Sequence, residues 1–301
     1  MTIIHALQTY NEIETYLLKH SGYSIKRTRQ GVLHFASHAK IELLAQITEA
    51  SVHAYFLEGM RTYNWEASTF HTKLITLRVF FDWCISKNWM TTNPARAIQK
   101  PKKEKKIPEK LTKEQAQRLL DIVYNMPYRY RFIRYRNHAM LSMCLYAGLR
   151  RAELLSIKYA DADVEHLTIF VRCGKGRKDR MIPMSSTLAQ ILREYLKERQ
   201  KLKTSVPELF VTRDGRNRVE LNSFTWFIKE FRKKSSIKFS LHKLRHTFAT
   251  LMIEGGCDIY SLSKMMGHTD IATTTIYLAA SVEHLRGQIL KHPMNGVNYE
   301  L

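Results

Sequence analysis

The sequence is short of negative charge. Its 301 residues include 27 aspartates and glutamates against 48 lysines and arginines, so the net charge at pH 7 is +21. Such an excess of positive charge favours a polyanionic partner, and nucleic acid is the commonest one. An anionic membrane surface is the rival interpretation.

The sequence also has few cysteines and no long apolar run. Cys84, Cys144, Cys173 and Cys257 are too far apart to form the CxxC spacing of a metal or redox site. They predict reduced, mostly buried thiols in a cytoplasmic protein. The longest apolar stretch, residues 139–149, is too short to span a bilayer, and the N-terminus lacks the features of a signal peptide. We therefore expect no membrane association.

Apolar residues are plentiful, at 45% of the total, and can form the cores of two domains. Residues 1–99 are expected to form a helical domain and residues 111–301 a second one. Residues 100–110 between them are basic, poor in apolar side chains and interrupted by two prolines. This linker is either a solvated loop or a strap across a phosphate backbone. Residues 1–100 carry eleven basic and seven acidic residues, about +4, so about +17 lies in the remainder, which is the stronger anion-binding part.

Helical periodicity dominates both predicted domains. In the first domain it predicts helices over residues 4–18, 24–37, 47–60 and 70–89. In the second it predicts helices over residues 137–146, 188–201, 222–234, 243–254, 259–266 and 282–290, and a capping box at Thr112 begins another. Alternating β-branched residues predict strands over 166–172, 177–184 and 208–212. The predicted fold is therefore mainly α with a small antiparallel β-sheet.

Histidines and arginines that suit an anion gather toward the C-terminal end. His242, Arg245 and His246 lie within five residues at the start of a predicted helix, whose N-terminal N–H groups also favour an anion. Arg150 and Arg245 could bind phosphate oxygens bidentately, which lysine does less well. His242 and His268 could add hydrogen bonds. Taken singly, each of these residues is more often a surface or structural group.

Two further residues could supply a proton and a nucleophile. Lys175 lies in a Gly-Lys-Gly turn between two predicted strands, where its ammonium could protonate a leaving oxygen. An ordinary exposed lysine is the alternative, and Arg177 and Lys178 compete for any contact there. Tyr277 follows a small polar segment. Its phenol, with an ordinary pKa of about 10, is a weak nucleophile, but neighbouring arginines and histidines would favour the phenolate.

A metal held by His242 and His246 is disfavoured. The two histidines are four residues apart on one helix, which suits a metal pair. However, no acidic third ligand lies near them in the sequence, and Arg245 would repel a cation. We therefore expect neither metal nor cofactor, and we expect His246 to pack against or support its neighbours.

Taken together and in this order, the motifs resemble the tyrosine recombinase family of phage-integrase and Xer-type enzymes. The resemblance covers about residues 111–292 and rests on Ala-Gly-Leu-Arg ending at Arg150, Gly-Lys-Gly around Lys175, His242-Lys243-Leu244-Arg245-His246, Gly267-His268 and Tyr277. Each motif alone is weak, but all five in order are specific. Two small departures are Arg151-Ala152, where an aliphatic-Ser pair is usual, and Met266, where Leu is usual. Neither removes a reacting group.

The resemblance implies both a fold and a reaction. The fold would be a two-domain, C-shaped DNA clamp, with a helical, SAM-like core-binding domain at 1–99 and an α+β catalytic domain at 111–301. The enzyme would be a site-specific recombinase that cuts and rejoins double-stranded DNA through a 3′-phosphotyrosyl intermediate and a Holliday junction. It would need neither metal nor ATP and would act as a tetramer on two sites, alone or with a paralogue. Integration, excision and resolution all remain open as its biological task.

The resemblance also implies residue roles. Tyr277 would be the nucleophile, Lys175 the general acid for the 5′-hydroxyl leaving group, and Glu153 would orient an arginine or histidine. The scissile phosphate would be bound by Arg150, His242, Arg245 and His268. The segment 282–301 would dock onto a neighbouring subunit, whereas packing against its own domain is the alternative.

DNA contacts outside this site are expected mainly at phosphates, where they set register rather than read bases. The candidates in the first domain are Lys26, Arg27, Arg29, Lys73 and Arg78. Those in the second are Arg129, Arg131, Arg134 and Arg136, which alternate with aromatic residues, and Arg177 and Lys178 in the turn. A solvated helix edge is the alternative for the alternating stretch.

Three other functions share some of these features. A type IB topoisomerase-like enzyme would use the same phosphate chemistry without a partner subunit. A non-catalytic DNA-binding protein would not need the complete residue set, and a metal-dependent nuclease would need a cluster of carboxylates that the sequence lacks. Covalent adduct formation in EDTA separates the two tyrosine-dependent enzymes from the nuclease and from the non-catalytic protein.

Overall fold

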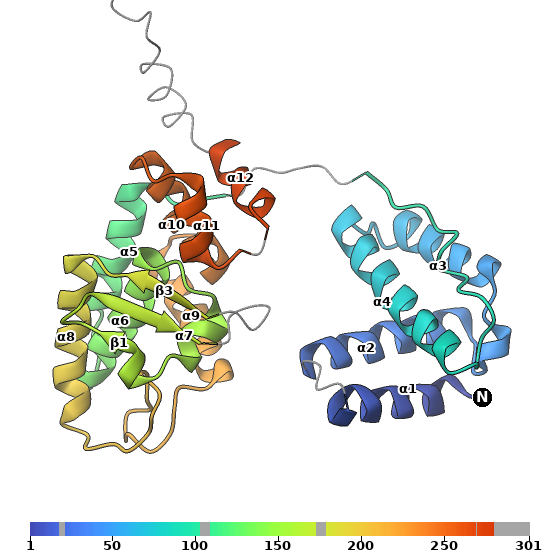
Figure 1. Cartoon of the computed structure of the whole chain (residues 1–301), viewed down its shortest axis with the longest axis horizontal. Coiled ribbons are helices and arrows are strands. Elements are labelled where there is room, and N and C mark those ends of the chain that lie inside the picture. The colour runs from blue at the N-terminus through green and yellow to red at the C-terminus, as the bar shows by residue number, and fades with distance from the viewer. Residues whose placement is uncertain (18–21, 103–108, 173–178, 269, 280–301) are drawn as a thin grey trace, which may run out of the picture. The chain divides into compact units, whose positions relative to one another are not determined.

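The computed structural model describes residues 1–17, 22–102, 109–172, 179–268 and 270–279. The chain divides into two compact units, Met1–Lys105 and Lys106–Leu301, which Figure 1 colours from blue to red along the sequence. Among the described residues, no helix combines the length and the apolar character needed to cross a membrane.

The N-terminal unit is built from helices, as the periodicity predicts. They are α1 (Ile3–Glu12), a π-helical turn (Ile13–Leu17), α2 (Gly22–Ala39), a 3₁₀ turn (Leu44–Gln46), α3 (Glu49–Arg61) and α4 (Ala67–Ser86). Thr48 starts α3 in a capping box, since its hydroxyl accepts from the N–H of Ser51 while the Ser51 hydroxyl accepts from the N–H of Thr48. Phe35, Tyr55 and Phe80 are among the buried aromatic side chains around which these helices pack.

The C-terminal unit combines helices with one small sheet. Its helices are α5 (Lys113–Asn125), α6 (Arg131–Tyr146), α7 (Arg151–Ser156), α8 (Ser186–Gln200), α9 (Leu221–Ser235), α10 (Leu241–Glu254), α11 (Ile259–Met266) and α12 (Ala272–Ala279). The predicted capping box of α5 is confirmed, with Thr112 and Gln115 exchanging hydrogen bonds of 3.1 Å each. Helix α6 begins at Arg131, earlier than predicted, so most of the alternating basic and aromatic stretch is helical.

The sheet is antiparallel and has the order β1-β2-β3, formed by β1 (Ala162–Asp163), β2 (Thr168–Val171) and β3 (Arg180–Pro183). Ile169 pairs with Ile182 in its centre, and both are buried. The predicted strand over 208–212 is wrong, because that segment forms only isolated bridges, one from Glu208 and one from Val211. The third strand is β1 instead. Strand β3 packs against α11, which brings two segments far apart in the sequence to one place.

Candidate active site

A sharp turn after α6 presents Arg150 at the start of α7. Gly148 has φ +58°, and a Cβ atom there would lie 2.3 Å from the ring of Phe248, so only glycine fits. Arg150 is the N-cap residue of α7, and its N–H donates to Glu153 Oε2 at 2.8 Å. Its Nη1 donates to Glu153 Oε1 at 2.7 Å. The predicted support of an arginine by Glu153 is therefore present in the structure.

Arg180, on β3, pairs with the same carboxylate of Glu153. Its Nη1 and Nη2 donate to the two carboxylate oxygens of Glu153 at 3.0 and 2.8 Å. Burial alone would raise the pKa of Glu153, but the hydrogen bonds from Arg180 and Arg150 lower it to about 2. One carboxylate thus holds two guanidiniums. Sequence reasoning missed Arg180, which in a short alternating strand had the pattern of an ordinary surface residue.

Three arginines converge on the C-terminal end of α11. Each donates to one of three successive carbonyl oxygens, at 2.8 Å from Arg180 to Met265, 2.6 Å from Arg245 to Met266 and 3.0 Å from Arg150 to Gly267. The end of a helix carries unpaired carbonyls and a partial negative charge, which favours cations. This helix end therefore fixes all three guanidiniums at one place.

Arg245 connects this helix end to His268. Its side chain is buried, at 4% exposure, and Nη1 donates to the carbonyl oxygen of Gly148. Its Nη2 lies 3.1 Å from His268 Nε2, while His268 Nδ1 lies 2.8 Å from the Thr274 hydroxyl. Both contacts are satisfied by a neutral His268 that accepts at Nε2 and donates from Nδ1. Burial and the charge of Arg150 lower the pKa of Arg245 to about 10, so it stays charged at neutral pH.

His242 lies in the first turn of α10, beside an open hollow of about 400 Å³. Exposed Arg151 and Arg232 line the hollow together with His242 and Arg245. Burial lowers the pKa of His242, and Arg245 and Arg150 lower it further. A concave surface lined by this many cations suits a phosphodiester.

Tyr277 is buried in α12, at 2% exposure. Its hydroxyl oxygen lies 2.8 Å from His246 Nδ1. Burial raises the pKa of the phenol, and the charges of Arg245 and Arg150 oppose that rise without reversing it. The two arginines thus favour the phenolate, as predicted, but burial outweighs them and the pKa of Tyr277 stays above its ordinary value.

The remaining predicted active-site groups fall outside the described residues. Lys175, Arg177 and Lys178 belong to residues 173–178, and the predicted docking segment 282–301 is likewise outside. Across the described ranges, no three histidine, cysteine or acidic side chains are arranged to hold a metal ion.

The predicted DNA contacts of the N-terminal unit separate into two groups. Lys26, Arg27 and Arg29 are exposed on α2. Lys73 instead lies over the Trp65 ring, with Nζ 4.5 Å from the centroid. Arg78 donates to carbonyls of the segment that follows α4, at 2.9 Å to Ala95, 3.2 Å to Arg96 and 2.8 Å to Ile98. Nε and Nη2 of Arg78 are thus committed within the unit.

The four arginines around the start of α6 also differ. Arg129 and Arg131 are exposed, and Arg131 pairs with Glu198 at 3.3 Å. Arg134 is partly buried, and its Nε has no hydrogen-bond partner among the described residues. Arg136 turns inward and donates to Asn137 and to the carbonyl oxygen of Val211. Exposure therefore favours Arg129 and Arg131 for a phosphate contact.

Comparison with known proteins gives one consistent result. The model of the Phage integrase family matches residues 109–284. The chain is 30% identical to the tyrosine recombinase XerC of Vibrio campbellii over 275 residues, which are 90% of this chain and 85% of the relative. It is 29% identical to XerC of Escherichia coli O1:K1 over 278 residues, or 92% and 91%.

Solved structures show the same architecture. The crystal structure of XerA recombinase has a TM-score of 0.54 at 27% identity, covering 96% of this chain and 98% of that one. The XerH site-specific recombinase bound to a palindromic difH substrate has a TM-score of 0.72 at 20% identity, covering 89% and 79%. At that identity the second likeness concerns the fold alone.

Proposed function

This chain belongs to the phage integrase family of tyrosine recombinases, and on that premise we propose that it recombines two specific double-stranded DNA sites through a 3′-phosphotyrosyl intermediate. The observation that carries the proposal is the convergence of Arg150, Arg245 and His268 at the end of α11, with Tyr277 on the adjacent helix. These elements are far apart in the sequence. They meet at one helix end, and Arg245 among them also lines the hollow beside His242. Fixed positive charge at one place is what phosphoryl chemistry on a polyanion needs.

In the proposed reaction the Tyr277 oxygen attacks the scissile phosphorus. Arg150 and Arg245 bind the non-bridging oxygens, and His242 donates a further hydrogen bond as negative charge builds up. To donate as well, His268 would have to release one of its contacts with Arg245 and Thr274. Lys175 protonates the departing 5′-oxygen. The protein–DNA phosphodiester that forms conserves the bond energy, so rejoining needs no ATP. Fixed side-chain charges take the place that a metal ion has in many nucleases.

Phosphate contacts away from the cut would position the DNA. We assign these to the exposed cations of α2, namely Lys26, Arg27 and Arg29, and to Arg129 and Arg131. Arg151 also lines the hollow beside His242 and would bind a phosphate next to the scissile one.

A half-site suicide substrate tests the reaction. Because the cut strand loses its short 5′-hydroxyl fragment, a covalent adduct should accumulate in EDTA and should disappear in Tyr277→Phe, which still binds the half-site. A Mg²⁺ requirement would contradict the mechanism. Relaxation of a plasmid without any specific site, by single subunits, would favour a topoisomerase-like function instead.

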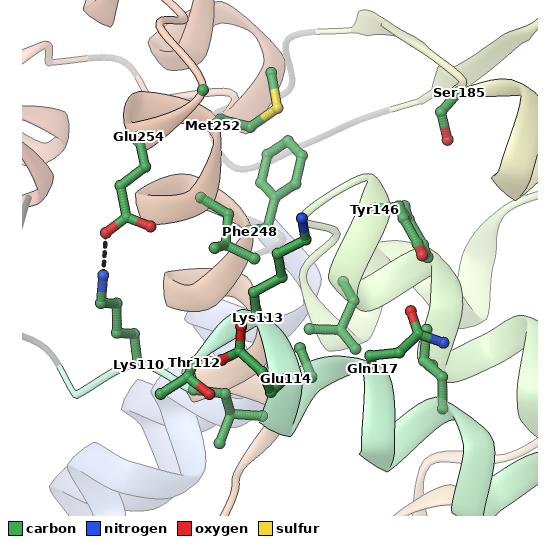
Figure 2. A pocket seen from close by; sticks show the side chains of 16 residues that line it. Lys110, Thr112, Lys113, Glu114, Gln117, Tyr146, Ser185, Phe248, Met252 and Glu254 are labelled. Atoms are coloured by element: carbon green, nitrogen blue, oxygen red, sulfur yellow. Dashed lines mark hydrogen bonds and ion pairs between the residues drawn. The ribbon is translucent and has the colours of Figure 1, made fainter. Parts of the chain in front are cut away.

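We further propose that the enzyme exchanges strands as a tetramer through a Holliday junction. An apolar hollow of about 700 Å³ between α5, α6 and α10 supports this part (Figure 2). Figure 2 shows Phe248 and Met252 facing it from α10, with the Lys110–Glu254 ion pair at one edge. Phe248 also packs in the cluster that buries Tyr277. A segment bound in the hollow would therefore touch Phe248, which packs in the same cluster as Tyr277.

The proposed occupant is the segment 282–301 of a neighbouring subunit, which carries Val282, Leu285, Ile289 and Leu290 at helical spacing. Deleting 282–301 should weaken pairing of two sites more than binding to one site. Met252→Lys, which places a charge in the hollow, should do the same. Tyr260→Lys, at an exposed apolar residue outside the hollow, is the matched control. Equal loss of single-site binding and pairing would count against the docking.

A further inference from the structure

The hydroxyl of Tyr277 is hydrogen-bonded to a histidine that lies outside the phosphate-binding set. His246 is on α10, one residue after Arg245, and its Nδ1 is 2.8 Å from the Tyr277 oxygen. The two rings are 5.4 Å apart between centroids, at an angle of 52°. In the neutral tautomer that carries its proton on Nε2, His246 Nδ1 accepts from the hydroxyl that would attack phosphorus.

Apolar side chains surround the phenol side of this contact. Tyr277 packs in a buried apolar cluster whose other members are Phe248, Ala249, Ile253, Leu262 and Met266. The helices α10 and α12 that carry the pair are packed directly against each other. His246 is therefore the protein group placed to receive a proton that leaves the buried phenol.

We propose that His246 is the base that accepts the phenolic proton of Tyr277 when its oxygen attacks the scissile phosphate. This inference rests on the proposed function. As the Tyr277 Oη–P bond forms, the proton of the hydroxyl passes to His246 Nδ1. As the P–O5′ bond breaks, the leaving oxygen takes a proton from the general acid assigned to Lys175. In rejoining, protonated His246 returns its proton to the departing phenolate.

The charge state of His246 fits this role. Burial, and then the neighbouring charges of His242 and Arg245, lower its pKa to about 4, so the imidazole is neutral at pH 7. The groups facing the pair are His242 and Arg245 on α10, Tyr277 itself, and Arg150, whose charge acts on the phenol. A bound phosphodiester offsets these positive charges and raises the basicity of His246 as the substrate arrives.

The other two histidines of the site are less suited to take this proton. His268 has one ring nitrogen on Arg245 and the other on Thr274. The His242 ring stands edge-on to His246 at 4.2 Å between centroids, but its resolved contacts do not include the Tyr277 hydroxyl. His246 is thus the histidine in direct contact with the nucleophilic oxygen.

Two substitutions separate a base from a group that only positions the phenol. Asparagine can place an amide oxygen near the position of Nδ1 and accept the same hydrogen bond, but it cannot take up the proton. We expect both His246→Ala and His246→Asn to slow single-turnover adduct formation about 10²–10⁴-fold on a half-site suicide substrate. A rate in His246→Asn within about threefold of the wild type, against a loss of the expected size in His246→Ala, would overturn the base role and leave a positioning one.

The pH profile supplies a readout that a structural defect would not give. The wild-type rate should change little between pH 6 and 9, because His246 is already neutral. Without the base, attack needs preformed phenolate, so the rate of His246→Asn should rise by about tenfold per pH unit. A flat profile in the variant would contradict the proposal. So would faster cleavage by His246→Ala, which would mean that the contact stores the tyrosine rather than activating it.

A substrate with a bridging 5′-phosphorothiolate distinguishes the two proton transfers, since its thiolate leaves without an acid. It should restore the rate of Lys175→Ala but not that of His246→Ala, and the reverse would place His246 at the leaving group.

His34→Asn is the matched control, because His34 Nδ1 lies 2.9 Å from the Tyr55 hydroxyl in the other unit. Its adduct formation should equal the wild-type rate. Adducts persisting in Tyr277→Phe would refute the proposed function itself, whatever the His246 variants do.

Discussion

Each unit of this chain buries a tyrosine whose hydroxyl is hydrogen-bonded to a histidine Nδ1. The pairs are Tyr55 with His34 at 2.9 Å and Tyr277 with His246 at 2.8 Å. In both, burial raises the pKa of the tyrosine and lowers that of the histidine. A buried tyrosine hydrogen-bonded to a histidine therefore does not by itself identify a catalytic site.

The surroundings make the difference. Tyr55 is packed among aromatic rings, including Phe35, Phe56 and Trp65, with a single lysine above them. Around Tyr277, Arg245 and Arg150 act on the phenol through their charges, and a hollow opens beside Arg245. Aromatic packing stabilises a fold, whereas several cations held at one open surface are suited to bind an anion.

The largest expected difference between the two units concerns two arginines, Arg245 and Arg78, whose guanidiniums both donate to backbone carbonyls. We expect Arg245→Lys to slow adduct formation about 10²–10³-fold, because an ammonium cannot grip the phosphate and the helix end together. Arg78→Lys should leave the rate unchanged and lower the free energy of unfolding by about 1–2 kcal/mol. Single-turnover cleavage measures the rate, and urea denaturation of the full chain measures the free energy of unfolding. A comparable rate loss in Arg78→Lys would erase the distinction between the units.

Sequence motifs predicted the groups that meet at the helix end, but not all of their contacts. Arg150, Arg245 and His268 lie in short motifs that can be recognised by their order along the chain. Arg180 was missed because its importance depends on β3 packing against α11, which no local pattern encodes. The contact of His246 with Tyr277 was missed for the same reason, since it needs α12 to fold back on α10.

The fold shows the same limit. Periodicity predicted most of the described helices and the two hairpin strands, because each depends on residues close in sequence, but it missed α7 and α12. It assigned residues 208–212 to the sheet, although β1 occupies the third position. It also treated Lys73 and Arg78 as exposed cations. Helical spacing gives the side of α4 on which they lie, but not the ring and carbonyls that meet them there.

An intermediate effect is expected where a carboxylate supports the arginines. The folded-state pKa of Glu153 is about 2, below the value of about 4.3 for an unfolded chain. Its stabilisation is therefore present above about pH 4 and is lost as the pH falls toward 2. Glu153→Gln should cost about 2–3 kcal/mol at pH 7, and the difference from wild type should shrink on acidification.

Glu58→Gln provides the counterpart in the other unit. Glu58 pairs with His38 at 3.1 Å but is half-exposed, so we expect a loss below about 1 kcal/mol.

A double-mutant cycle between Glu153→Gln and Arg180→Met adds a test in cleavage. If Arg180 acts by sharing the Glu153 carboxylate, the double variant should cleave faster than the product of the two single losses predicts. Strict additivity would mean that the two side chains act separately.

The smallest expected effects distinguish two lysines of the N-terminal unit. Lys73 donates to the Tyr55 hydroxyl at 3.2 Å and lies over Trp65, and burial lowers its pKa. Lys73→Met should therefore lower the free energy of unfolding by about 1 kcal/mol while leaving the salt dependence of half-site binding unchanged. Lys26→Met, at an exposed residue, should do the reverse and reduce the slope of log K against log salt by about 1. If Lys73→Met lowers that slope instead, its ammonium leaves the ring to bind phosphate, and the aromatic cluster around Tyr55 would then share the phosphate-binding role that we assign to Lys26, Arg27 and Arg29.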